Sequence, residues 1–74
     1  MKQAEMKKRA LKNLDYYING LKNAQTKFYI SSNYFSACAV LHVIYFDLNI
    51  ITTDEYDKLD KEITKEHTKA WERV

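Results

Sequence analysis

The stretch from Asn33 to Asn49 constrains the fold more than any other part of this chain of 74 residues. Inside it only Ser36, His42 and Asp47 are polar, and no glycine or proline interrupts it. On a helical projection Ser36 and Asp47 share one direction, and the remaining directions are apolar. A helix that is apolar nearly all round has to be covered on more than one side. The rest of the chain is therefore expected to cover this helix.

Apolar residues recur at helical spacing before this stretch, at Met6, Ala10, Leu11, Leu14, Tyr17, Ile18, Leu21, Ala24 and Phe28. This spacing predicts one long amphipathic helix over residues 2–29, with Gly20 on its solvent-facing side. Ser31, Ser32 and Asn33 are residue types that favour helix caps. They predict the end of the first helix and the start of the second, which is expected over residues 34–48.

The clearest local signal lies at the start of the third helix. Thr52 as the N-cap, with Glu55 three residues later, predicts a capping box. Ile51 before the cap and Tyr56 after it predict a hydrophobic staple. A helix is therefore expected over residues 53–73, with one apolar face formed by Tyr56, Leu59, Ile63, His67, Ala70 and Val74.

Short turns between three helices predict an all-α, antiparallel, up-down-up arrangement in a single domain. The second helix is expected to end near Asn49, which tolerates a left-handed conformation. A chain of 74 residues is near the size at which one core is only marginally sufficient. Since the first and third helices each offer one apolar stripe, we expect the second helix to form a homodimer interface. The residues predicted for that interface are Tyr34, Phe35, Cys38, Leu41, His42, Tyr45 and Phe46.

The segment Ile50-Ile51-Thr52-Thr53-Asp54-Glu55-Tyr56, with Ile63 seven residues after the tyrosine, resembles the short C-terminal helical hairpin module known as SHOCT. The resemblance runs from the end of the second helix through Ile63. Asn49 stands where that family usually has glycine, Leu59 stands where a basic residue is common, and a long helix precedes the hairpin. The resemblance implies a small oligomerising module near nucleic acid, and it carries over no catalytic residues.

The single cysteine, Cys38, excludes a disulfide within the chain and favours a reducing, cytoplasmic setting. The basic, amphipathic start of the chain predicts no secretory signal. The central apolar stretch is shorter than the about 20 residues that span a bilayer, and His42 interrupts it. These features predict a soluble, cytoplasmic protein with no membrane partner.

Two groups of side chains are candidates for metal chemistry. Cys38 and His42 are four residues apart and share a helix face, but a structural zinc site needs four ligands and no second pair exists. Glu62, Glu66 and His67 lie close in sequence, yet the glutamates fall outside the apolar stripe and His67 falls on it. We interpret these residues as packed or solvated, and the sequence predicts no metal, no cofactor and no catalytic site.

Charge is unequally divided along the chain. Residues 1–30 carry seven basic and two acidic residues, whereas residues 46–74 carry five basic and eight acidic ones. The opposite charges either neutralise each other within the fold or across a dimer, or leave a basic end that meets nucleic acid or an acidic protein. The residues predicted for such contacts are Lys8, Arg9, Lys12, Tyr16 and Lys27.

Together these features predict a small non-enzymatic helical module for protein–protein interaction, acting as a homodimer. A composition rich in Lys, Asn, Ile and Tyr fits an AT-rich genome. We therefore expect an accessory or inhibitor protein encoded by a phage or mobile element. The alternative is a small nucleic-acid-binding protein that uses the basic face of the first helix.

Overall fold

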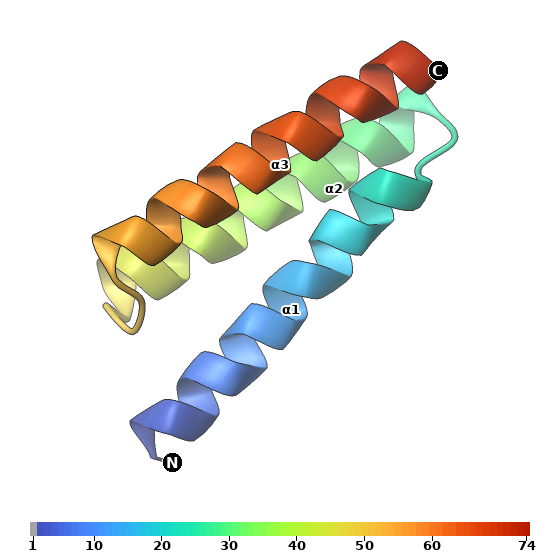
Figure 1. Ribbon diagram of the computed structural model, residues 1–74. Helices are drawn as coiled ribbons and strands as arrows, with labels where there is room; N and C mark the ends of the chain where they lie inside the picture. Colours follow the sequence, from blue (N-terminus) through green and yellow to red (C-terminus); the bar gives the residue numbers. More distant parts are fainter. Residues whose placement is uncertain (1) are drawn as a thin grey trace.

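The computed structural model describes residues 2–74, which form three α-helices: α1 (Gln3–Asn23), α2 (Lys27–His42) and α3 (Thr53–Arg73). A π-helical turn, η1 (Val43–Asp47), continues α2 directly. α2 and α3 lie side by side in opposite directions, and α1 packs against both (Figure 1). The predicted all-α, up-down-up arrangement is confirmed. Within the described residues, no helix has both the length and the apolar character needed to cross a membrane.

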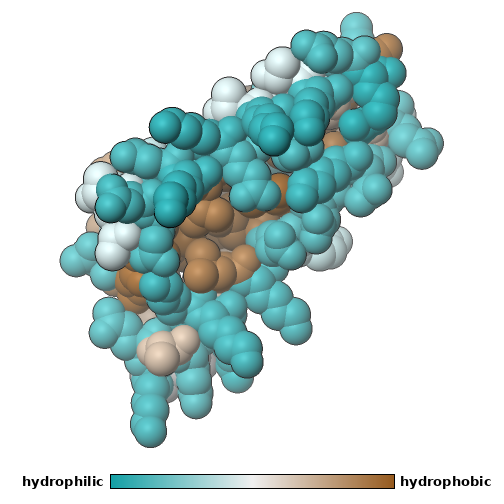
Figure 2. Space-filling model, viewed as in Figure 1, coloured by the Kyte–Doolittle hydropathy of each residue, from teal (hydrophilic) through white to brown (hydrophobic). Residues whose placement is uncertain are grey.

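The three helices meet at a core of aliphatic side chains. The buried residues are Leu14, Ile18, Leu21, Ala24, Ile30, Ala37, Leu41, Ile44, Ile50, Ile51, Ile63 and Ala70. Near its N-terminal end α1 diverges from the other two helices (Figure 1). Apolar surface shows between α1 and α3 in the same view (Figure 2). Met6, Ala10 and Leu11 of α1 and Leu59 of α3 are half-buried and pack against the core.

The first turn lies at Ala24–Thr26, so the predicted boundaries at residues 29 and 34 are wrong. The N–H of Ala24 donates to the carbonyl of Leu21 at 3.3 Å, which closes α1. The hydroxyl of Thr26 accepts a hydrogen bond from the N–H of Tyr29 at 3.2 Å, which makes Thr26 the N-cap of α2. The segment expected to separate two helices is therefore the second turn of α2.

Burial explains why the turn falls earlier than the local sequence suggests. A helix that begins at Lys27 places Ile30, Ala37 and Leu41 on one side, where each is at most 3% exposed. Removing these side chains from water contributes more than the weak intrinsic preferences of serine and asparagine. Asn33 is accommodated because its side-chain amide donates to the carbonyl of Tyr29 one turn earlier, at 2.8 Å.

Gly20 lies where α1 meets α2, which corrects its predicted position on a solvent-facing side. A Cβ atom built on Gly20 would overlap the side-chain amide of Asn33. The absence of a side chain at this position lets the two helices approach closely. The prediction was wrong because α2 starts seven residues earlier than expected and brings Asn33 alongside α1.

The second turn was better predicted than the first. As expected, Asn49 adopts a left-handed conformation, with φ of 51°. The sequence did not predict the π-helical turn before it, in which the N–H of Leu48 donates to the carbonyl of Val43 at 2.8 Å. The N–H of Ile50 then donates to the carbonyl of Ile44 at 3.1 Å, so the chain reverses with its backbone groups paired.

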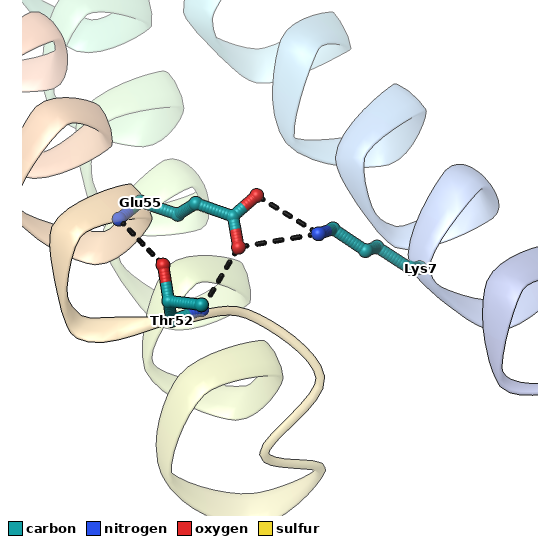
Figure 3. Close-up of polar contacts among 3 residues, drawn as sticks. All are labelled: Lys7, Thr52 and Glu55. Atoms are coloured by element: carbon teal, nitrogen blue, oxygen red, sulfur yellow. Dashed lines mark hydrogen bonds and ion pairs between the residues drawn. The ribbon is translucent and has the colours of Figure 1, made fainter.

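α3 has the predicted span and the predicted capping box (Figure 3). The N–H of Glu55 donates to the Thr52 hydroxyl at 3.1 Å, and the N–H of Thr52 donates to the Glu55 carboxylate at 2.9 Å. The Lys7 ammonium group approaches the same carboxylate at 2.9 Å, so one glutamate serves both the helix start and α1. Lys22 and Glu62 form a second, looser pair at 3.9 Å. Part of the charge asymmetry is thus neutralised between α1 and α3.

Candidate interaction surface

α2 presents a row of aromatic side chains to solvent on the side opposite its buried residues. Phe28 is 74% exposed, Phe35 69% and Phe46 57%, and His42 is also exposed. The spacings of seven residues place Phe28, Phe35 and His42 on one face of α2, and Phe46 follows four residues later in η1, with its ring 4.7 Å from that of His42. Ser32 and Ala39 lie between them and are exposed as well. We call the set Phe28, Ser32, Phe35, Ala39, His42 and Phe46 the α2 outer face.

The α2 outer face carries no full charge. From Phe28 to Phe46 the sequence contains no Asp, Glu, Lys or Arg, while Lys27 and Asp47 stand at the two ends. Apolar surface in a contiguous patch marks sites of macromolecular contact in soluble proteins. Interface cores are in addition rich in aromatic residues and poor in charged ones. The α2 outer face has both properties.

Aromatic side chains of α3 extend this surface at the N-terminal end of α2. Tyr34 stacks on His67 with 3.9 Å between ring centroids. The indole N–H of Trp71 donates to Nε2 of His67 at 2.8 Å, which joins the two side chains one turn apart on α3. Trp71 is 40% exposed, and the Lys27 ammonium group lies 5.7 Å from the centroid of its ring.

A second aromatic cluster fixes the other end of the surface. Phe46 contacts His42 and Tyr45, each at 4.7 Å between ring centroids, and Tyr56 at 5.8 Å. Tyr45 stacks on Tyr56 at 4.4 Å and shares a hydrogen bond of 2.7 Å with the Thr53 hydroxyl. These neighbours restrict the rotamers of Phe46 and Tyr45, which lowers the conformational entropy lost when a partner binds.

Three of the seven predicted interface residues lie on this surface. Phe35, His42 and Phe46 belong to the α2 outer face, and Tyr34, Cys38 and Tyr45 are half-buried. Tyr34 and Tyr45 contact α3 through His67 and Tyr56. Leu41 is 3% exposed and lies in the core, so its assignment to an interface is wrong. It falls on the side of α2 that faces the other two helices.

Phe28 is the functional candidate that the sequence analysis missed. The predicted boundary at residue 29 assigned it to the apolar stripe of the first helix. Its spacing of seven residues from Phe35, and of fourteen from His42, is a signal that could have found it. Ser36 is half-buried while Phe35 is exposed.

Cys38 lies beside the α2 outer face, in an environment that favours the neutral thiol. Burial raises the pKa of Cys38 above its ordinary value, the Asp60 carboxylate raises it further, and a hydrogen bond with Tyr34 opposes the change. The pKa of Tyr34 is raised in turn, mainly by the charge that Cys38 would carry as a thiolate. Among the described residues, no three or more His, Cys, Asp or Glu side chains converge as metal ligands would.

Three basic residues of α1 lie close together, apart from Lys7 and Lys22, which pair with glutamates of α3. Lys8, Arg9 and Lys12 line one shallow hollow together with Glu5. Tyr16, one turn further along, is 70% exposed and packs edge-on against Tyr17 at 5.2 Å. Lys27 does not join this group, because it lies at the start of α2 over the ring of Trp71. The structure therefore brings together four of the five residues predicted for nucleic-acid or acidic-partner contacts.

Comparisons with protein-family models, with curated proteins and with solved structures gave no match to this chain. The resemblance to the SHOCT module stays a prediction. The expected phage or mobile-element origin and the expected cytoplasmic location also stay predictions.

Proposed function

We propose that this chain is a small non-enzymatic protein–protein interaction module that self-associates as a homodimer through the α2 outer face. The observation that carries the proposal is the exposure of Phe28, Phe35 and Phe46 in one uncharged row. Full burial of a phenylalanine side chain contributes roughly 1.5–3 kcal/mol. Three such side chains at the centre of an interface supply the kind of anchors that dominate binding energies.

The size of the chain supports the same proposal. The buried core consists of aliphatic side chains, while Phe28, Tyr29 and Phe35 of α2 are exposed. Small domains gain stability from association, because the surface-to-volume ratio limits what one core can bury. A second copy placed on the α2 outer face would shield its phenylalanines from water and add their burial to the stability of the fold.

Analytical ultracentrifugation of the double variant Phe28→Gln/Phe35→Gln tests the proposal. We expect the unchanged protein to sediment as a dimer at high concentration and to dissociate on dilution. The variant should sediment as a monomer and keep its helical circular dichroism, because both side chains are exposed in the single chain. Tyr16→Gln is the matched control: it removes another exposed aromatic side chain, but from α1, and should leave the dimer intact.

A monomer at every concentration for the unchanged protein would contradict the proposal. Equal loss of the dimer in Phe28→Gln/Phe35→Gln and in Tyr16→Gln would contradict the assignment of the interface to α2. Retention of the dimer in Phe28→Gln/Phe35→Gln would also contradict the assignment of the interface to α2.

Nucleic-acid binding through α1 is a second candidate, favoured by the grouping of Lys8, Arg9 and Lys12 beside the exposed ring of Tyr16. Among residues 2–74 these three side chains form no ion pair, whereas Lys7 and Lys22 each pair with a glutamate of α3. Basic side chains bind phosphates, and an exposed tyrosine stacks on unpaired bases. Glu5 in the same hollow weakens the attraction.

A binding titration with single-stranded and double-stranded DNA and RNA at two salt concentrations tests this second candidate. Replacing Lys8, Arg9 and Lys12 with glutamine should weaken binding and reduce its dependence on salt, because fewer counterions are released. Lys65→Gln/Lys69→Gln on the exposed side of α3 is the control. Unchanged affinity and salt dependence in the triple variant would exclude this face as a nucleic-acid site.

A further inference from the structure

Two copies of the α2 outer face are complementary when one is placed against the other in the opposite direction. Counted outward from residue 37, its members fall into pairs at equal distances: Phe35 with Ala39, Ser32 with His42, and Phe28 with Phe46. The next pair at equal distance from residue 37 is Lys27 with Asp47. All eight of these residues are exposed. The central pair thus combines a large side chain with a small one, and the next pair combines a serine with a histidine. The two outer pairs combine two aromatic rings and then a base with an acid.

We infer that the partner on this face is a second copy whose α2 runs antiparallel, with a twofold axis at the level of Ala37. The inference rests on the proposed function and adds the orientation and register of the two copies. In a twofold interface each residue pair occurs twice, because residue i contacts residue j of the partner and the reverse. The pairing around Ala37 has this reciprocal form.

Shape supports this register at the centre of the interface. Phe35 of each copy lies opposite Ala39 of the other, so a ring meets a methyl group. Ala39 borders an apolar hollow of about 300 Å³ between α1 and α2, which is also lined by Asn13, Val40, Val43, Ile44 and Leu48. A phenylalanine that passes over Ala39 reaches the edge of this hollow. Large side chains packed against small ones allow two helices to interdigitate.

Charge supports the antiparallel direction at the ends of the interface. In the antiparallel arrangement Lys27 of each copy lies at the level of Asp47 of the other, whereas a parallel arrangement would place like charges together. The first turn of α2 contains no acidic residue, so the positive end of its helix dipole lacks a compensating charge within that turn. Asp47 of the second copy would supply one. Such complementary charges select orientation and register more than they add affinity.

Cross-linking of cysteine variants distinguishes the two directions. In a Cys38→Ser background, Lys27→Cys and Asp47→Cys are made singly and together, and a short bifunctional thiol reagent is added. The antiparallel arrangement predicts dimer cross-links in the double variant and little in either single one. A parallel arrangement predicts cross-links in both single variants, and that result would overturn the inference.

Spin labelling provides a second readout that does not depend on a reaction between thiols. A nitroxide at the Lys27→Cys position should lie about 30 Å from its symmetry mate, because about ten α-helical residues in each copy separate position 27 from the level of the axis at Ala37. A much shorter distance would contradict the antiparallel direction. Sedimentation of the same samples separates the two proposals: loss of all dimer refutes the proposed function, whereas a dimer with the wrong distances refutes only this register.

Discussion

The Arg73 guanidinium donates a hydrogen bond of 2.6 Å to the carbonyl oxygen of Ala24, and so joins the end of α3 to the end of α1. The same nitrogen donates to the carbonyl of Leu21 at 3.2 Å. The Leu21 carbonyl also accepts from the N–H of Ala24, whereas the carbonyl of Ala24, the C-cap, lies beyond the last helical turn. A positive charge at this position also interacts favourably with the negative end of the helix dipole. Arg73 thus stabilises a helix from which it is distant in sequence.

We expect Arg73→Gln to lower the free energy of unfolding by about 1–2 kcal/mol, since hydrogen bonds from a charged donor are lost. Urea denaturation followed by circular dichroism measures the change. Lys69→Gln, an exposed lysine one turn earlier in α3, is the control and should change stability by less than about 0.5 kcal/mol. Equal stability of the two variants would show that the contacts of Arg73 contribute nothing.

The close approach of Gly20 to Asn33 predicts a non-additive pair of substitutions. Gly20→Ala alone should gain little or lose stability, because the new methyl group displaces the Asn33 amide from its hydrogen bond with Tyr29. In an Asn33→Ala background the same change should stabilise the protein by up to about 1 kcal/mol, the usual gain of alanine over glycine in a helix. A double-mutant cycle of unfolding free energies measures the coupling. Additive changes in unfolding free energy would show that a methyl group at position 20 does not overlap the Asn33 side chain.

The carboxylate of Glu55 predicts a loss of stability in acid. The hydrogen bond from the Thr52 N–H, together with the hydrogen bond and charge of Lys7, holds the pKa of Glu55 below its ordinary value of 4.5. Since the folded state has the lower pKa, the stabilisation is present above that ordinary value and is lost as the pH falls through the folded-state pKa. Thermal denaturation over a pH series should show a smaller acid-induced loss in Glu55→Gln than in the unchanged protein.

Glu72→Gln is the control for this pH series, because Glu72 is an exposed carboxylate on the same helix. It should keep the pH dependence of the unchanged protein. Lys7→Gln should reduce the acid-induced loss only in part, since the bond from the Thr52 N–H remains. If the stability of Glu55→Gln and of Glu72→Gln had the same pH dependence, the acid-induced loss could not be attributed to Glu55.

Cys38 is expected to alkylate slowly. Because burial and Asp60 raise the pKa of the thiol, the reactive thiolate is scarce at neutral pH. The rate of reaction with iodoacetamide should be well below that of glutathione and should rise as the pH increases. Asp60→Asn should shift the rate profile toward lower pH, because a negative charge near the thiolate is removed. A native protein that reacts as fast as glutathione at neutral pH would refute this prediction.

Local chemistry in the sequence was sufficient to predict α3 and the left-handed Asn49, because every group involved lies within a few residues. The first turn was not predictable in this way. Thr26 is a weaker local signal than the run Ser31–Asn33, and the choice between them depends on whether Ile30 is buried. That burial requires contacts with residues of α1 and α3 that are distant in sequence.

The same limit applies to the candidate site. The sequence predicted that α2 exposes more apolar surface than its neighbours cover, and the exposure of Phe35 and Phe46 is consistent with that prediction. It did not predict which side remains uncovered, because that depends on where α1 crosses α2. Once Gly20 and Asn33 bring the two helices together, Ser36 is half-buried and the row that contains Phe28 faces solvent.

The sharing of one carboxylate by Thr52 and Lys7 has a consequence for the order in which the bundle opens. The first half of α1 diverges from its neighbours and leaves Met6 and Ala10 half-buried (Figure 1). When Glu55 becomes protonated, the first turn of α3 and this half of α1 lose the same interaction together. Fraying should therefore begin at that end, and deuterium should replace the amide proton of Ala10 long before that of Leu21.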